Sequence, residues 1–218
     1  MSKPKAVIFD MDGLLIDTEK HLVASWMQAA REFGYPFEYE HGLMLRSLTK
    51  QYAAPLLKKT FDDSFDYFTV RERRKEIMEE KIRKAGIERK PGAKELLSYL
   101  HEKGIKTAVA TATDLERAER YLKEVDLWGE FDKVVCVSMV NIGKPEPDVY
   151  IYACEQIGEK PPSCMALEDS PNGIRSAYAA GLMPVMVPDL TEPDEEIKKL
   201  LFAKATTLAD VIDIIENL

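Results

Sequence analysis

Residues 9–19 read FDMDGLLIDTE and continue directly from an apolar run at residues 5–10. That run is short, rich in aliphatic residues and apolar on both faces, which is typical of a buried strand in a parallel sheet. Open parallel sheets bind ligands at the carboxyl ends of their strands, so we expect Asp10 and Asp12 at the mouth of a site. Their spacing allows both carboxylates to point the same way, and Gly13 allows a sharp turn after them.

Four later segments repeat the pattern of the first strand. Each is short and mostly apolar, and each is separated from the next by a segment of helical length; they are residues 105–111, 133–138, 164–168 and 183–188. Alternating strands and helices with right-handed crossovers predict an α/β fold, a doubly wound Rossmann-like parallel sheet in three layers.

Two of the intervening helices carry recognisable start signals. Ser170 and Pro171 predict an N-cap followed by a proline in the first helical position. Thr113 and Glu116 have the spacing of a capping box at the start of another helix.

One stretch, between about residues 18 and 83, breaks the alternation and predicts helices without a strand. Trp26, Ala30 and Phe33 keep helical spacing there. We therefore expect an all-α cap domain, residues 17–84, inserted into a core domain of residues 1–16 and 85–218. Hinges are expected at both junctions, so that the cap opens and closes over the site.

The Asp10 and Asp12 pair has a functional and a structural interpretation. Adjacent carboxylates repel each other unless a cation or a shared proton compensates them, which favours a magnesium site and a division of roles between nucleophile and acid. A polar turn after a strand would also place two aspartates here.

Other polar residues fall at or just beyond the ends of predicted strands. Thr111 can donate hydrogen bonds to a phosphate, Lys144 offers a positive charge, and Glu168 with Asp169 supplies oxygen ligands suited to Mg²⁺. Each alone has a structural alternative, such as a helix cap or a solvated charge, but their order along the chain favours one common site.

The sequence resembles the haloacid dehalogenase superfamily, and within it the β-phosphoglucomutase-like phosphatases with a helical cap. The resemblance covers essentially the whole chain through four motifs, FDMDGLLIDTE, ATATD, GKPEPDVY and ALEDSPNGIRSAYAAG. It implies an Mg²⁺-dependent phosphatase acting on a small phosphorylated metabolite. Asp12 argues against carbon–halogen cleavage, because the dehalogenases lack an aspartate at this position and need no metal.

The resemblance also implies a role for each motif residue. Asp10 would attack phosphorus to form an aspartyl-phosphate, while Asp12 would protonate the leaving oxygen and later activate water. Mg²⁺ would be held by the carboxylates of Asp10 and Asp169 and the backbone carbonyl of Asp12, with Glu168 acting on this shell through water or neighbouring contacts. The residues expected to bind the substrate and its phosphoryl group are Thr111, Ala112, Lys144, Arg46 and Glu19.

A β-phosphoglucomutase is the principal alternative. Those enzymes carry a histidine and an arginine at two cap positions that here are Leu22 and Leu48, which favours a phosphatase. His21 is one residue early and on a helix would point about 100° away, unless a shift restores it. In the cap loop LMLRSLTK, Arg46 and Lys50 either contact a polar or anionic substrate or are solvated charges.

A receiver-type signalling domain also holds a phosphoryl group with aspartates, a threonine and a lysine. Those domains are shorter, lack a cap, and place the acceptor aspartate after a later strand. A non-enzymatic phospho-acceptor is thus a remote alternative.

Composition limits the remaining possibilities. Charged residues are 31% of the chain and the net charge is −8, which argues against binding to nucleic acid polymers and to membranes. Three cysteines without CxxC spacing indicate free thiols in a reducing compartment. We expect a cytoplasmic protein and, by default, a monomer.

Overall fold

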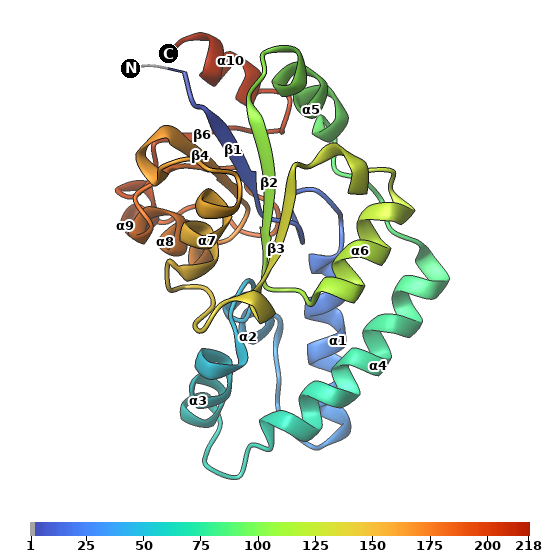
Figure 1. Cartoon of the computed structure of the whole chain (residues 1–218). Helices are drawn as coiled ribbons and strands as arrows, with labels where there is room; N and C mark the ends of the chain where they lie inside the picture. Colours follow the sequence, from blue (N-terminus) through green and yellow to red (C-terminus); the bar gives the residue numbers. More distant parts are fainter. Residues whose placement is uncertain (1–2) are drawn as a thin grey trace.

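The computed structural model describes residues 3–218 and contains one six-stranded sheet in which all neighbouring strands are parallel (Figure 1). The strand order is β3-β2-β1-β4-β5-β6, the order of a doubly wound nucleotide-binding sheet. The strands are β1 Ala6–Phe9, β2 Lys106–Thr111, β3 Lys133–Cys136, β4 Cys164–Glu168, β5 Met183–Met186 and β6 Ala203–Lys204. The predicted fold class is confirmed. β6 was not predicted, because two residues are too few to show a pattern.

Helices cover both faces of the sheet. Val7 and Phe9 of β1 pack into a core with α5, α6 and α10, whereas Ala6 and Ile8 face α7 and α8 on the other side. This alternation places the central strand between two apolar layers. The core helices are α5 Ala93–Glu102, α6 Leu115–Glu124, α7 Asp148–Gln156, α8 Pro171–Ala179, α9 Glu195–Lys198 and α10 Val211–Glu216, with short 3₁₀ turns at Trp128–Glu130, Val137–Met139 and Pro161–Ser163.

Four helices lie at the carboxyl ends of the strands, opposite the chain termini (Figure 1). They are α1 Glu19–Glu32, α2 Tyr39–Met44, α3 Lys50–Thr60 and α4 Tyr67–Ala85. They enclose an apolar cluster of their own, in which the Trp26 ring stacks on Phe37 at 6.3 Å and lies 5.7 Å from Tyr67. A separate cluster makes these helices a packing unit beside the sheet, which we call the cap.

The two connections between cap and core run side by side. Ile16 and Arg89 form an antiparallel bridge, and the Asp17 amide donates to the Glu88 carbonyl at 2.9 Å. This arrangement holds both crossings close to the end of β1.

The helix starts were predicted with mixed success. Ser170 is the N-cap of α8 and accepts from the Gly173 amide, as predicted. The capping box at Thr113 was wrong, because α6 is capped by Asp114, whose carboxylate accepts from the Arg117 amide. The Thr113 hydroxyl instead donates to Oδ2 of Asp12, so it does not cap α6.

All three cysteines are buried and form no disulfide bond. Within residues 3–218, no helix combines the length and the apolar character that crossing a bilayer requires.

Candidate active site

The end of β1 turns sharply into the site. The Asp10 amide still donates to the Leu167 carbonyl of β4, after which the chain turns at Gly13, whose φ is +85°. A Cβ atom at Gly13 would lie 2.4 Å from Oδ2 of Asp169. Only glycine fits here, because the turn needs a left-handed backbone and the carboxylate approaches closely.

Three carboxylates from two adjacent strands converge beside this turn. Asp10, Glu168 and Asp169 are buried, and each offers an oxygen within 4.8 Å of the others' oxygens. Among the residues described, nothing donates a hydrogen bond to Oδ2 of Asp10, Oδ1 of Asp169 or Oε2 of the nearby Glu19. Unpartnered buried carboxylate oxygens are costly, and a hard divalent cation such as Mg²⁺ is the kind of group that they fit.

Lys144 lies between two of these carboxylates. Its ammonium donates to Oδ1 of Asp10 at 2.6 Å and to Oε1 of Glu168 at 2.6 Å. The Tyr150 hydroxyl also donates to Oε1 of Glu168, at 2.6 Å. Glu168 therefore anchors Lys144 against Asp10. Tyr150 was not predicted as a site residue, although it is the last residue of the GKPEPDVY motif.

Burial dominates the electrostatics of the cluster. It raises the pKa of Asp10 well above its usual range against the opposing charge of Lys144, and it raises the pKa of Asp169 to about 8. Burial, reinforced by the charge of Asp169, also raises the pKa of Glu19. Burial alone would lower the pKa of Lys144, but the charges of Asp10 and Glu168 outweigh it and raise that pKa. The site holds more negative charge than its cations balance, which favours binding of a further cation.

The carboxylate of Asp12 is not part of this cluster and is held by two hydroxyls. Thr18 Oγ1 lies 2.6 Å from Oδ1 of Asp12, and Thr113 Oγ1 lies 2.8 Å from Oδ2. The two aspartates thus sit in different environments, as separate roles would require. Thr113 was missed as a site residue because the sequence pattern suggested a helix cap.

Thr111 and Ala112, which were also expected at the site, lie next to the two aspartates. Thr111 is buried at the end of β2, and its hydroxyl oxygen accepts from the Thr113 amide at 3.0 Å. Thr111 and Ala112 both line a pocket that also exposes Asp10 and Asp12.

Arg46 occupies a different place from the one expected. It is buried, its Nη1 donates to Oδ2 of Asp169 at 3.2 Å, and its Nη2 contacts the Thr191 hydroxyl. Arg46 does not line the pocket, whereas Glu19 and Lys50 do. Its guanidinium pairs with Asp169 and so offsets part of the negative charge of the acidic cluster.

The two cap positions that bear on a mutase are both apolar and face the pocket. Leu22 and Leu48 line it, and His21 does not. His21 lies in the first turn of α1, and the shift that would bring its imidazole to the pocket is not present in this structure.

The pocket spans the boundary between core and cap, with a volume of about 670 Å³. This is the usual size for a site that binds a small molecule. Asp10, Asp12 and Thr111 form its core side, and the cap side includes Trp26 and Tyr67. One carboxylate held by a lysine and a second held by hydroxyls can together support transfer of a phosphoryl group.

Comparison with known proteins agrees with this geometry. Residues 4–181 match the family model of haloacid dehalogenase-like hydrolases. The phosphorylated carbohydrates phosphatase of Thermotoga maritima is 31% identical over 82% of this chain and 82% of its own. The probable pseudouridine-5'-phosphatase of Drosophila melanogaster is 33% identical over 84% of this chain and 80% of its own.

A solved structure shares the fold. The β-phosphoglucomutase of Clostridium difficile superposes with a TM-score of 0.81 at 20% identity, covering 98% of this chain and 97% of that one. The resemblance inferred from the four motifs is confirmed, and the chain belongs to the haloacid dehalogenase-like hydrolase family.

Proposed function

We propose that this protein is a magnesium-dependent phosphatase that hydrolyses a small phosphate monoester through an aspartyl-phosphate on Asp10, acting as a cytoplasmic monomer. The observation that carries the proposal is how the two carboxylate oxygens of Asp10 are bound. Lys144 holds its Oδ1 at 2.6 Å, while its Oδ2 has no hydrogen-bond partner within the described residues and the side chain borders the pocket. A carboxylate that is fixed in this way beside the pocket can bind a cation through one oxygen and attack phosphorus with the other.

Mg²⁺ fits the oxygen donors at this point. The carboxylates of Asp10 and Asp169 and the backbone carbonyl of Asp12 would hold it, while Glu168, already engaged with Lys144, would act from the second layer. When bound, the cation would offset the charge of the phosphoryl oxygens and keep Asp10 ionised despite its burial.

The chain's own residues supply the chemical steps. An Asp10 oxygen forms a bond to phosphorus as the bond to the ester oxygen breaks, and Asp12 gives its proton to that oxygen. Asp12 then takes a proton from water, whose oxygen attacks phosphorus and releases inorganic phosphate from Asp10. Because hydroxyls both donate and accept, Thr18 and Thr113 can hold Asp12 in either protonation state. Lys144 and Thr111 would bind the phosphoryl oxygens.

The pocket favours a phosphatase over a mutase. Leu22 and Leu48 line it at the two decisive cap positions, and their hydrocarbon side chains can neither transfer a proton nor bind a sugar hydroxyl. Two similar proteins are named a phosphorylated carbohydrates phosphatase and a probable pseudouridine-5'-phosphatase, so a phosphorylated sugar or nucleoside is the substrate class we propose to test first. Glu19 and Ala112, which border the same pocket, would contact its sugar.

The test is phosphate release from a panel of sugar and nucleoside monophosphates, measured with Mg²⁺ and with EDTA. Glucose 6-phosphate formed from β-glucose 1-phosphate is followed as a separate product. Release of inorganic phosphate that EDTA abolishes would support the phosphatase. Formation of glucose 6-phosphate with little phosphate release would replace it with a mutase, and an aspartyl-phosphate that never turns over would indicate a phospho-acceptor.

A further inference from the structure

Arg74 is a buried cation at the cap end of the pocket, and none of the described residues is an anionic partner for it. It lies in the middle of α4, is 7% exposed, and lines the same pocket as Asp10. Within residues 3–218, no carboxylate forms an ion pair with it, and its Nε has no hydrogen-bond partner. Its only polar contact there is a long one, from Nη1 to the Met78 sulfur at 3.7 Å.

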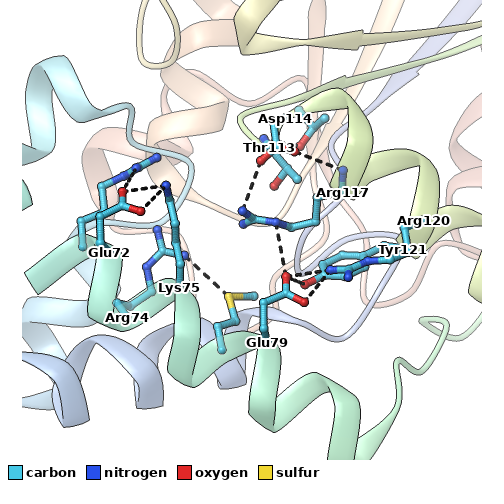
Figure 2. A network of polar contacts seen from close by, with 12 residues as sticks. Glu72, Arg74, Lys75, Glu79, Thr113, Asp114, Arg117, Arg120 and Tyr121 are labelled. Carbon is cyan, nitrogen blue, oxygen red and sulfur yellow. Dashed lines mark hydrogen bonds and ion pairs between the residues drawn. The ribbon is translucent and has the colours of Figure 1, made fainter.

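The other cations on this wall are paired. Arg71 and Lys75 bind Glu72 at 3.2 and 2.7 Å. Arg117, which reaches across from α6, binds Asp114 at 3.2 Å and approaches Glu79 at 3.7 Å (Figure 2). Among the arginines and lysines of α4 and α6 that line the pocket, only Arg74 lacks an ion pair within residues 3–218, although carboxylates lie nearby.

The spacing along α4 directs these cations toward the pocket. Tyr67, Arg71, Arg74, Lys75 and Met78 share one face of the helix and all line the pocket, whereas no carboxylate of α4 does. Figure 2 shows Arg74 beside Lys75 on α4 and Arg117 extending from α6 toward Glu79 of α4. Burial, together with the like charges of Arg71 and Arg117, lowers the pKa of Arg74 to about 10.

Contact with an aromatic ring also fixes the orientation of the Arg74 side chain. Its guanidinium lies 5.2 Å from the centroid of the Trp26 ring, and Trp26 lines the pocket too. Contact with an aromatic face fixes the plane of the guanidinium and leaves the N–H groups at its edge available. Such an edge binds the paired oxygens of a phosphate or carboxylate.

We propose that Arg74 recognises a second anionic group on the substrate, a phosphate or a carboxylate bound at the cap end of the pocket while the scissile phosphate lies at Asp10. This inference rests on the proposed phosphatase function. It narrows the substrate to a small phosphate ester that carries a further anion, since one pocket of about 670 Å³ joins both ends.

The test compares ester pairs that differ only in the distal anion. 3-Phosphoglycerate is paired with glycerol 3-phosphate, and propanediol bisphosphate with propanediol monophosphate. The ratio of kcat/KM within each pair is measured for the wild type, Arg74→Met and Arg73→Met. Arg73 is the matched control, because it is the adjacent arginine of α4, pairs with Glu32 and Glu76, and does not line the pocket.

Arg74→Met is expected to lower the ratio by about 10- to 100-fold, the effect of losing a charge-assisted contact, and Arg73→Met to leave it within about twofold. The pair that responds more strongly identifies the distal group. A ratio that Arg74→Met leaves within twofold would overturn the proposal and make Arg74 a structural partner of Trp26 alone. A wild type that binds and hydrolyses both members of each pair equally would overturn it too.

A binding experiment separates this inference from the proposed function. Calorimetry with the same esters is performed on Asp10→Asn and on Asp10→Asn combined with Arg74→Met. Tighter binding of the esters that carry the distal anion, lost in the variant without Arg74, supports the site even if no ester is hydrolysed. Hydrolysis without such a difference would leave the phosphatase intact and refute the role of Arg74.

Discussion

Arg46 and Asp169 form a buried ion pair between the cap and the core, with Nη1 3.2 Å from Oδ2, although 123 residues separate them in the sequence. The same cap loop is held by Asn172, whose side-chain amide donates to the Arg46 carbonyl at 2.8 Å. The loop thus places a positive charge on a carboxylate that we propose as a magnesium ligand. Arg46 and the metal should therefore both stabilise the negative charge of Asp169.

Arg46→Met is expected to destabilise the protein mainly when divalent cations are absent. In EDTA, the free energy of unfolding should fall by about 3 kcal/mol, because Asp169 would remain buried without an opposite charge. Saturating Mg²⁺ should recover most of this loss. Urea unfolding at several Mg²⁺ concentrations measures both quantities, with the exposed cap residue Arg31, changed to Met, as control. Equal losses with and without Mg²⁺ would show that Arg46 and the cation do not share Asp169.

Asp10→Asn is expected to remove turnover and preserve the fold. The amide keeps the shape of the side chain but cannot attack phosphorus, so kcat should fall at least about 10³-fold. Unfolding free energy should stay the same or rise, because burial raises the pKa of Asp10 and the amide removes a buried charge, while Lys144 keeps Glu168 as its partner. Phosphate release and urea unfolding are measured beside Asp63→Asn, an exposed cap control. Activity within tenfold of wild type would assign the nucleophile elsewhere.

Much of the site could be predicted because its residues follow strands. Asp10, Thr111, Lys144 and Asp169 lie at or beyond the carboxyl ends of β1 to β4, and a parallel sheet brings such positions together whatever the helices between them do. The partner of Arg46 could not be predicted, because nothing local in a cap loop specifies which distant carboxylate it meets.

Thr113 illustrates a different limit. Its spacing to Glu116 favours a capping box, but Asp114 can also cap, and the local sequence does not rank the two. The choice is made by tertiary structure, since Asp12 binds the Thr113 hydroxyl. β6 shows the same limit for the fold, because its two residues become a strand only by pairing with β5.

Thr113→Val is expected to lower kcat about 10-fold and change KM by less than about twofold, because it removes one of the two hydroxyls that hold Asp12. Thr113→Ser keeps the hydroxyl and should keep most of kcat. Steady-state kinetics of both variants on one ester checks this. Equal losses in the two variants would point to lost packing of the methyl group and away from the contact with Asp12.

Gly13→Ala is expected to lower the stability of the protein by more than the backbone strain of the turn alone, and to weaken Mg²⁺ binding. Gly13 and Gly34 both have φ of +85°, but a Cβ at Gly13 would lie 2.4 Å from Oδ2 of Asp169, whereas one at Gly34 would meet nothing within 4 Å. Gly34→Ala therefore measures the backbone strain by itself, about 1–2 kcal/mol. Gly13→Ala carries the same strain and also displaces Asp169, so it should cost about 2 kcal/mol more and weaken Mg²⁺ binding. Urea unfolding and magnesium titration of the two variants separate these effects. If both lose the same stability and bind Mg²⁺ equally well, Asp169 can move without consequence, and the tight turn after β1 does not position the proposed metal ligand.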